Sequence, residues 1–197
     1  MGAGHVCLMI LVMMVLPIAL DVVKSLIYMN RNQYSKAKKP QMIQVVIKEQ
    51  MLYFLNNAKV EKRYPISTSK YGNGNKSGSN KTPLGDHLIC SKIGKNAPLG
   101  SVFVKCRNTG KLARIHRRSH PASSDLITTR ILRLQGLQDG INCGDGIDSF
   151  KRCIYIHGTP EEHLIGAKAS HGCIRMKNRH IIELFDLLKR GTLVKIH

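Results

Sequence analysis

The sequence has few acidic residues, few aromatic residues and few cysteines, and it contains no tryptophan. Only twelve Asp and Glu accompany 31 Lys and Arg, which gives a formal charge of +19 over 197 residues. Six cysteines are about 3% of the chain, too few for a fold built on disulfide bridges. The composition also excludes a collagen-like chain, a coiled coil and a polytopic membrane protein. Hydrophobic residues still make up 43%, more than a disordered basic tail contains, so we expect one packed domain behind a short leader.

Positive charge is concentrated in the middle of the chain. Residues 62–133 contain fifteen Lys and Arg and only two acids, Asp86 and Asp125. Such a field attracts nucleic acid, anionic lipid or anionic cell-wall polymer, and a solvated basic face without a partner is the simpler interpretation. Binding of single-stranded nucleic acid relies on stacking aromatic residues, and this stretch has only three. We therefore expect no nucleic-acid partner.

A hydrophobic segment at residues 6–20 contains fifteen residues without a charge. This length suits the hydrophobic region of a secretory signal and is below the ~20 residues of a membrane-spanning helix. No Lys or Arg precedes the segment and no A-x-A cleavage site follows it, so an uncleaved anchor over residues 6–27 and a buried core helix are alternatives. We expect residues 1–30 to be a signal peptide or inner-membrane anchor, and the protein to be exported to the periplasm or cell envelope. Residues 31–41 are predicted to link this leader to a domain over residues 42–197.

Most of the domain is predicted to be β-structure. Residues 42–55 are rich in Val, Ile, Tyr and Phe, and the polar pair Lys48-Glu49 indicates two antiparallel strands around a turn. Further strands are predicted at residues 63–69, 87–93, 101–105, 126–134, 152–157 and 193–197. Residues 71–83 are typical of a loop because Gly, Asn and Ser dominate them, and the basic residues 110–124 are expected to cover a surface groove.

One helix is predicted near the C-terminus, with Asn178 as its N-cap residue. Its apolar face has a period of 3.6 residues and consists of Ile181, Ile182, Leu184, Phe185 and Leu188. Lys189 and Arg190 suit the negative end of this helix, and Gly191 suits the position after its C-cap. Many short strands with one or two short helices predict a mostly β barrel or sandwich.

The chemically most informative stretch is residues 155–176. The predicted strand at residues 152–157 ends at His157, and Gly158 follows, where a backbone without a Cβ lets a ligand approach closely. Cys173 lies further along the same stretch. An imidazole beside a thiol generates the thiolate, which is the nucleophilic form. We therefore expect folding to bring His157 and Cys173 together, with a packed thiol beside a surface histidine as the alternative.

Residues around Cys173 offer the other groups that acyl transfer requires. Gly172 permits a tight turn, and its amide and that of Cys173 are predicted to hold an oxyanion. Arg175, two residues beyond the thiol, carries a planar guanidinium suited to a substrate carboxylate. A zinc site made of His157, His171 and Cys173 is the alternative, but the chain lacks the C-x-x-C and H-E-x-x-H spacings. We expect no metal and no cofactor.

The stretch resembles the nucleophile motif of the L,D-transpeptidases with a YkuD-type catalytic domain. The residues that carry the motif are His157-Gly158-Thr159 and Ser170-His171-Gly172-Cys173-Ile174-Arg175-Met176. The likeness covers residues 42–197 and includes Thr82-Pro83-Leu84-Gly85, residues 93–103, Thr129-Arg130 and Gly191-Thr192-Leu193-Val194. It implies an L,D-transpeptidase-like β-sandwich domain that remodels peptidoglycan, an anionic polymer whose binding would also explain the basic charge.

The resemblance also implies a role for each matching residue. Cys173 would attack the peptide bond between the third residue of a stem peptide and a terminal D-Ala, with His157 as general base and then general acid. An acceptor amine of a second stem would resolve the thioester. The residues expected around the oxyanion and the substrate are His171, Gly172, Ser170, Arg175 and Gly158. Among them, Ser170 would order the loop and Arg175 would grip a stem carboxylate.

Alternatives to this function remain open in the sequence. Water as the acceptor would make the protein an L,D-carboxypeptidase, and a non-enzymatic basic envelope-binding domain would use the charge alone. A lipoprotein or a D-amino acid could also replace the second stem as acceptor. Cys143 and Cys153 flank a Gly- and Asp-rich loop and suit either a disulfide or free thiols, as do Cys90 and Cys106.

Overall fold

The computed structural model describes residues 41–118 and 125–197, so the expected leader and nearly all of the expected linker lie outside the described residues. The elements are β1 (Met42–Val46), β2 (Met51–Asn56), β3 (Lys59–Ser67), β4 (Gly85–Ile93), β5 (Ser101–Val104), β6 (Arg107–Leu112), β7 (Ile127–Gly136), β8 (Tyr155–Gly158), the 3-10 helix η1 (Glu162–Leu164), β9 (Ile174–Met176), α2 (Asn178–Leu187) and β10 (Leu193–Ile196). No helix among the described residues has both the length and the apolar character that crossing a membrane requires.

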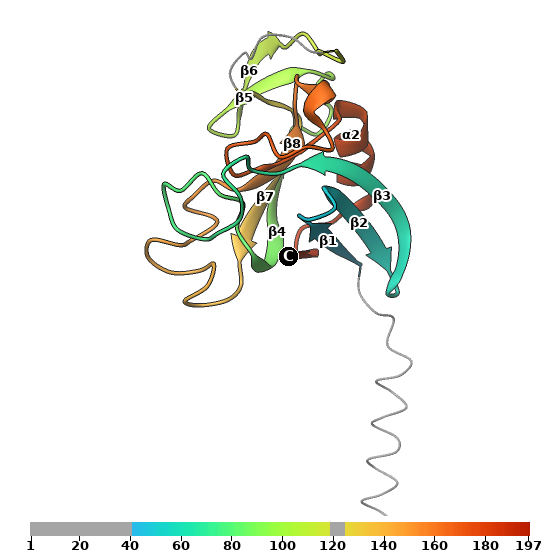
Figure 1. The fold of residues 1–197 in the computed structure, drawn as a ribbon. Helices are drawn as coiled ribbons and strands as arrows, with labels where there is room; N and C mark the ends of the chain where they lie inside the picture. Colours follow the sequence, from blue (N-terminus) through green and yellow to red (C-terminus); the bar gives the residue numbers. More distant parts are fainter. Residues whose placement is uncertain (1–40, 119–124) are drawn as a thin grey trace, which may run out of the picture. The chain divides into compact units, whose positions relative to one another are not determined.

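Eight of the strands close into a barrel. They follow the order β4-β10-β1-β2-β3-β9-β8-β7, and a further pairing of β4 with β7 completes the ring. The pairs β1–β10 and β8–β9 are parallel, and the other pairs are antiparallel. The hairpin of β5 and β6 extends from the edge of β7 (Figure 1). Closure leaves only the hairpin with a free sheet edge among these strands.

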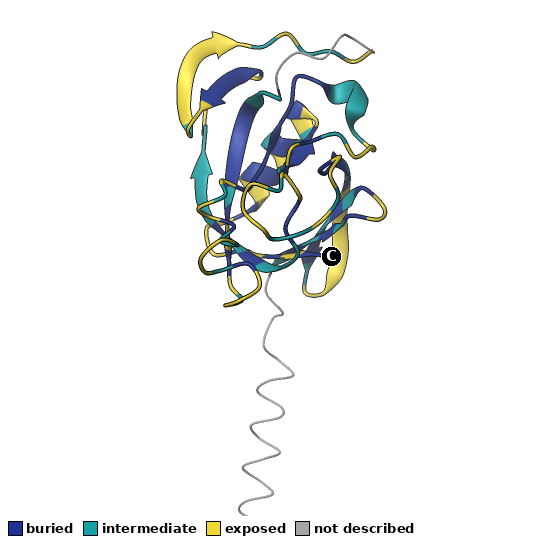
Figure 2. Cartoon of the chain, turned by 60° about the vertical axis from the view of Figure 1, so that its left-hand side comes forward, coloured by how far each residue is buried: buried dark blue, intermediate teal, exposed yellow. Residues whose placement is uncertain are grey.

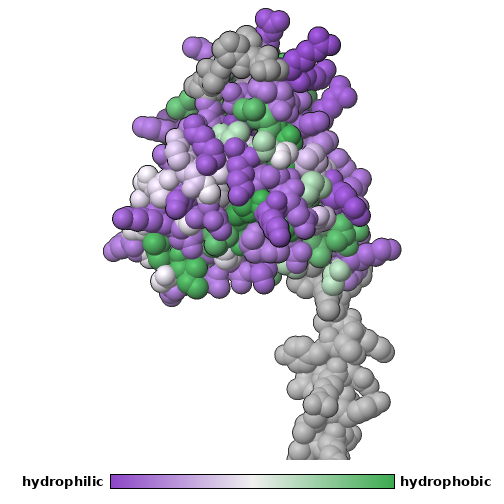
Figure 3. Space-filling view, in the orientation of Figure 1, coloured by the Kyte–Doolittle hydropathy of each residue, from purple (hydrophilic) through white to green (hydrophobic). Residues whose placement is uncertain are grey.

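The core lies between the barrel strands and one face of α2. Along β1 and β2 buried and less buried side chains alternate, as expected for strands with one face toward a core. The apolar face of α2, with Ile181, Leu184 and Phe185, joins the same buried cluster as β1 and packs against β7 and β8. The outer surface is different in character: β6 is exposed along its whole length (Figure 2), and hydrophilic residues dominate the face seen in Figure 3. The mostly β barrel predicted from the sequence is therefore confirmed.

Most predicted strands are present, and the differences have local causes. The hairpin predicted at residues 42–55 is β1 and β2 around a four-residue turn. β8 begins at Tyr155 rather than at residue 152, because residues 151–153 form a turn in which Cys153 has a φ of 57°. β6 was not predicted because its residues are polar and all exposed, and β9 was not predicted because it has only three residues.

Both ends of α2 differ from the sequence prediction. Lys177, not Asn178, is the N-cap residue, and the carboxylate of Glu162 accepts the Asn178 N–H at 2.8 Å. The Asn178 side chain is buried, and it donates to the carbonyl oxygen of Thr159. At the other end the C-cap is Leu188, so Gly191 lies three residues beyond it, in a turn with a φ of 85°. Distant residues therefore replace the caps predicted from local sequence.

Lys92 of β4 supplies the cap at the C-terminus of α2. Its ammonium donates to the carbonyl oxygens of Phe185 at 2.6 Å and of Leu188 at 2.5 Å, and it lies 4.4 Å from the centre of the Phe185 ring. Because hydrogen bonds from a charged group satisfy two otherwise unpaired helix carbonyls, we expect Lys92→Met to lower the free energy of unfolding by about 2–3 kcal/mol. Urea denaturation measures the loss. The exposed Lys95, changed to Met, is the control, and an equal loss in both variants would contradict the capping role.

Candidate active site

His157 is buried near the end of β8, with 1% of its surface exposed. Its Nδ1 lies 2.7 Å from the carbonyl oxygen of Gly158. A carbonyl oxygen only accepts, so Nδ1 carries the proton and Nε2 carries the free lone pair. Burial lowers the pKa of His157, against the raising effect of Asp125 and of the Gly158 hydrogen bond. The ring is therefore neutral at pH 7 and able to accept a proton at Nε2.

Cys173 lies immediately before β9, the strand that pairs with β8 and its His157. β8 and β9 are parallel with His157 opposite Arg175, so Cys173 precedes the residue opposite Ile156. Because side chains alternate along a strand, residues 155, 157, 173 and 175 are expected on one face of this pair. Cys173 packs against a small hydrophobic cluster that includes Tyr155, and its thiol donates to the carbonyl oxygen of Cys153 at 3.5 Å. The parallel pairing thus brings Cys173, at the start of β9, close to the strand that carries His157.

Asp125 is a site residue that the sequence analysis noted only as one of two acids in a basic stretch. One of its carboxylate oxygens accepts the backbone N–H of His171 at 3.1 Å and lies 2.9 Å from His171 Nδ1. The other oxygen accepts from Arg175 Nη1 at 3.1 Å. Burial acts to raise the pKa of Asp125. The charges of His157 and Arg175 and the hydrogen bonds from His171 and Arg175 outweigh burial, and they hold the pKa of Asp125 below its ordinary value. Asp125 is therefore ionised at neutral pH and places a negative charge near His157.

Arg175 has no exposed surface and is held by acidic and hydroxyl side chains. Its Nη1 lies 2.8 Å from Glu161 Oε2 as well as 3.1 Å from Asp125, and its Nη2 donates to Ser67 Oγ at 3.3 Å. The sequence predicts that this guanidinium binds a substrate carboxylate. The geometry differs, because the planar donor groups already bind two carboxylates of the protein itself. In this structure Arg175 braces the strand that follows the thiol.

Ser170 makes two hydrogen bonds within the loop before Cys173. The Ser170 hydroxyl is buried, donates to the carbonyl oxygen of Cys173 at 2.6 Å and accepts the Gly172 N–H at 3.3 Å. Gly172 has a φ of 123°, a left-handed conformation that side chains rarely adopt. The His171 N–H is bound to Asp125, so it is not an oxyanion donor in this conformation. The Gly172 N–H is likewise bound, to Ser170 Oγ, so among the expected oxyanion residues the Cys173 N–H is the better candidate donor in this conformation.

Gly158 has a packing role in addition to accepting the His157 hydrogen bond. A Cβ at this position would lie 2.5 Å from the side-chain oxygen of Asn178 and 2.8 Å from the carbonyl oxygen of Thr128. Glycine is thus required for close packing against the start of α2. The sequence predicts that this glycine lets a ligand approach, but protein atoms fill the space beside it.

Comparison with known proteins identifies the family of this domain. Residues 40–196 match the YkuD family model, described as the L,D-transpeptidase catalytic domain. The chain belongs to this family. It is also similar to the proteins named YkuD from Bacillus licheniformis, 49% identical over 41 residues, and from Bacillus subtilis, 48% identical over 42 residues. Each match covers 21% of this chain and only about a quarter of the relative (25% and 26%).

The fold of the domain is similar to that of solved L,D-transpeptidases. An L,D-transpeptidase from Mycobacterium tuberculosis H37Rv aligns with a TM-score of 0.50 and 14% sequence identity, over 80% of this chain and 57% of that chain. At this identity the likeness concerns the fold alone. The YkuD domain of this chain thus has the barrel of its family.

The described part of this YkuD domain contains no cluster of side chains that could hold the zinc ion considered as an alternative. No three His, Cys, Asp or Glu side chains among residues 41–118 and 125–197 converge as a ligand set. His171, one of the three residues considered for zinc, is paired with Asp125. The five cysteines in this part of the chain are free, so Cys143 and Cys153 form no bridge here.

The thiol of Cys173 is not a thiolate in the resting YkuD domain. The residue is partly exposed, but its thiol is enclosed by protein, and this burial, together with Asp125 and Cys153, raises the pKa of Cys173 to about 12 despite the Tyr155 backbone and Arg152. The sequence analysis expected an imidazole to ionise the thiol. Since His157 is also neutral, the proton shared between Cys173 and His157 lies on the Cys173 sulfur before substrate binds.

This protonation state predicts slow alkylation of Cys173. Because only the thiolate reacts, the rate with iodoacetamide should rise about tenfold per pH unit from pH 7 to 10 without a plateau. Peptide mapping by mass spectrometry after timed labelling measures Cys173, and the exposed Cys153 in the same sample is the internal reference. A plateau of the Cys173 rate near pH 6 or 7 would instead indicate a thiolate–imidazolium pair.

Proposed function

We propose that this chain is a cysteine-dependent L,D-transpeptidase that acts on peptidoglycan stem peptides, with Cys173 as nucleophile and His157 as general base. Membership of the YkuD family supports action on peptidoglycan. The observation that carries the residue assignment is the parallel pairing of β8 with β9, which places a neutral, Nδ1-protonated His157 on the strand next to Cys173. A cell-envelope location follows from this substrate and is part of the proposal.

The first half of the reaction forms a thioester. As the Cys173 sulfur bonds to the carbonyl carbon of the third stem residue, its proton passes to Nε2 of His157. The resulting imidazolium is stabilised by the Gly158 carbonyl and by the charge of Asp125, which both favour the protonated ring. The N–H of Cys173 is proposed to bind the oxyanion, and the N–H of Gly172 joins it once its 3.3 Å hydrogen bond to Ser170 Oγ is released. The imidazolium then returns the proton to the leaving amine, and D-Ala departs.

The second half consumes the thioester. An acceptor amine attacks the thioester carbonyl, His157 removes a proton from that amine, and the Cys173 sulfur leaves and regains a proton. One peptide bond has then been broken and one formed, so no external energy source is needed. Concerted proton transfer explains how a thiol with a pKa of about 12 can act near neutral pH, because the thiolate need not exist before substrate binds.

Product masses test the proposal. The purified full-length protein is incubated with a disaccharide tetrapeptide, and both peptides and intact protein are analysed by mass spectrometry, with heat-denatured protein as control. We expect release of D-Ala, a protein adduct with the mass of the disaccharide-tripeptide acyl group, and a crosslinked dimer. A free disaccharide tripeptide without dimer would indicate an L,D-carboxypeptidase. Unchanged substrate with no adduct would contradict the enzymatic function and favour the envelope-binding alternative.

A further inference from the structure

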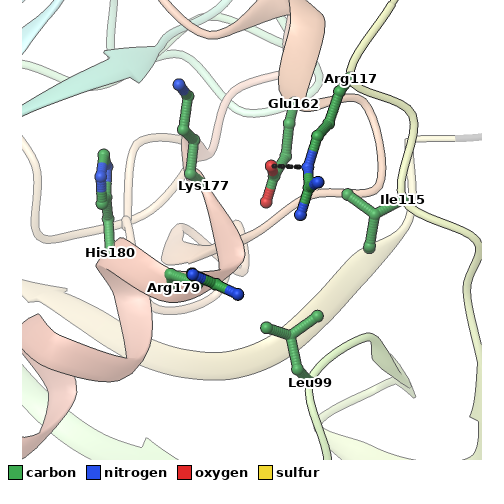
Figure 4. A pocket seen from close by; sticks show the side chains of 7 residues that line it. All are labelled: Leu99, Ile115, Arg117, Glu162, Lys177, Arg179 and His180. Carbon is green, nitrogen blue, oxygen red and sulfur yellow. Dashed lines mark ion pairs between the residues drawn. The ribbon is translucent and has the colours of Figure 1, made fainter.

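A pocket of about 390 Å³ lies at the start of α2, outside the set of residues assigned to the reaction. The residues that line it are Leu99, Ile115, Arg117, Glu162, Lys177, Arg179 and His180. They come from four parts of the chain: the turn before β5, the segment after β6, η1, and the first turn of α2 with its N-cap residue. Figure 4 shows the guanidinium groups of Arg117 and Arg179 directed toward one space, with Leu99 and Ile115 beside it. The pocket thus combines cationic and aliphatic walls.

The charge of this pocket is positive. Arg117, Lys177 and Arg179 contribute three cations, and Glu162 is the single acid. The Glu162 carboxylate is already occupied, since Oε1 accepts the backbone N–H of Asn178 at 2.8 Å and its side-chain amide at 2.9 Å. Its other oxygen lies 3.9 Å from Arg117. Excess positive charge therefore remains for an anionic ligand.

The walls of the pocket are anchored to the active-site strands. The His116 N–H, next to Arg117 in the chain, donates to the carbonyl oxygen of Pro160 at 2.7 Å, and His116 forms a β-bridge with Glu161. Glu161 in turn binds the Arg175 guanidinium. His180 Nδ1 is buried in the same region and has no hydrogen-bond partner among the described residues. The pocket is thus a pre-formed space whose walls are held to the active-site strands by backbone hydrogen bonds.

The separation between Cys173 and the pocket can be compared with the length of an acceptor stem. Cys173 and Lys177 are separated by β9, four steps of extended chain, which span about 13 Å. In the reaction proposed above, an acceptor stem brings the side-chain amine of its diamino acid to the thioester on Cys173. From this amine, through the extended side chain and one further residue, to the C-terminal carboxylate is about 10–13 Å. An acceptor stem is therefore long enough to reach from Cys173 to the edge of the pocket at Lys177.

We propose that this pocket binds the C-terminal carboxylate of the acceptor stem peptide, with Arg117 and Arg179 as its ligands and Leu99 and Ile115 in contact with the adjoining aliphatic groups. The inference rests on the proposed transpeptidase function. Paired guanidinium groups match a carboxylate through planar, charge-assisted hydrogen bonds. The pocket would therefore select the acceptor without taking part in thioester formation.

Separate measurement of the two half-reactions tests this assignment. Arg117→Ala and Arg179→Ala are compared with wild type and with Arg118→Ala, which removes a neighbouring exposed positive charge that does not line the pocket. Thioester formation is followed by D-Ala release from a donor tetrapeptide, and acceptor capture is followed by dimer formation at varied acceptor concentration. We expect unchanged thioester formation in all four proteins and an acceptor KM about tenfold higher in the two pocket variants only.

Acceptor chemistry gives a second readout that a structural effect would not change. An acceptor whose C-terminal carboxylate is converted to an amide should show the raised KM already with wild type, and Arg179→Ala should raise it no further. Equal KM values for the acid and amide acceptors, or equal effects of Arg118→Ala and Arg179→Ala, would overturn the pocket assignment. So would a parallel fall in thioester formation in the pocket variants. Absence of thioester in wild type would instead overturn the proposed function itself.

Discussion

We expect Cys173→Ala to abolish the protein–acyl adduct and to lower D-Ala release by at least about 10³-fold, because no other group in the proposed reaction supplies the attacking atom. Replacing it by Ser is expected to be almost as severe. A serine hydroxyl is a weaker nucleophile than a thiol, and the neutral His157 would have to activate a much weaker acid. Both variants should retain the fold, since the thiol donates only a long 3.5 Å hydrogen bond to the carbonyl oxygen of Cys153 and the residue is partly exposed.

Three measurements define this result. Intact-protein mass spectrometry detects the adduct, chromatography quantifies D-Ala, and thermal unfolding reports the fold. Cys153→Ser is the matched control, because Cys153 is exposed, its backbone accepts the Cys173 hydrogen bond, and the isosteric change leaves that backbone in place. Activity of Cys153→Ser should be close to that of wild type. D-Ala release by Cys173→Ala within tenfold of the wild-type rate would remove Cys173 from the proposed chemistry.

Sequence patterns predicted the β1–β2 hairpin and α2 because these elements carry their own periodicity. Alternation along β1 and the 3.6-residue repeat of α2 are properties of local sequence. The caps of α2 could not be predicted in the same way. Glu162 reaches Asn178 from η1, and Lys92 reaches the last turn from β4, so both contacts depend on the closed barrel. Where tertiary contacts satisfy the backbone N–H and C=O groups at a helix end, the cap residues preferred by the local sequence are not required.

The candidate site shows the same division between local and tertiary information. Its two chemical groups, His157 and Cys173, are adjacent to recognisable glycines and were predicted from the sequence. Asp125 and Glu161, the partners of Arg175, were not assigned, because their roles arise from contacts made after folding. One sequence feature did point to Asp125. It is an isolated acid within a basic stretch, so an ion pair with a nearby cation could have been predicted for it. Nothing in the sequence indicated that the thiol would be protonated, because burial is a tertiary property.

Arg175→Met is expected to cause the largest loss of stability in the described domain, about 3–5 kcal/mol in the free energy of unfolding at pH 7. The substitution retains a long side chain but leaves Glu161, 7% exposed, and Asp125 without their shared cation. Arg63→Met, at an exposed position of β3, is the matched control and should change stability by less than about 0.5 kcal/mol. Adding Glu161→Gln to Arg175→Met removes one unpaired charge and should restore part of the loss.

The dependence of this loss on pH distinguishes charge pairing from side-chain packing. The folded-state pKa of Asp125 is below its ordinary value, so its ionisation stabilises the fold above the unfolded pKa of about 4, and this contribution disappears as the pH falls through the folded pKa. Arg175 is one cause of that lowered pKa, so Arg175→Met removes part of a contribution that exists only where Asp125 is ionised. The difference between wild type and Arg175→Met should therefore be largest near pH 7 and should narrow below pH 4 in urea denaturation series. A difference that is the same at both pH values would show that Arg175 stabilises the strand through packing of its side chain, and that its two carboxylate partners contribute little.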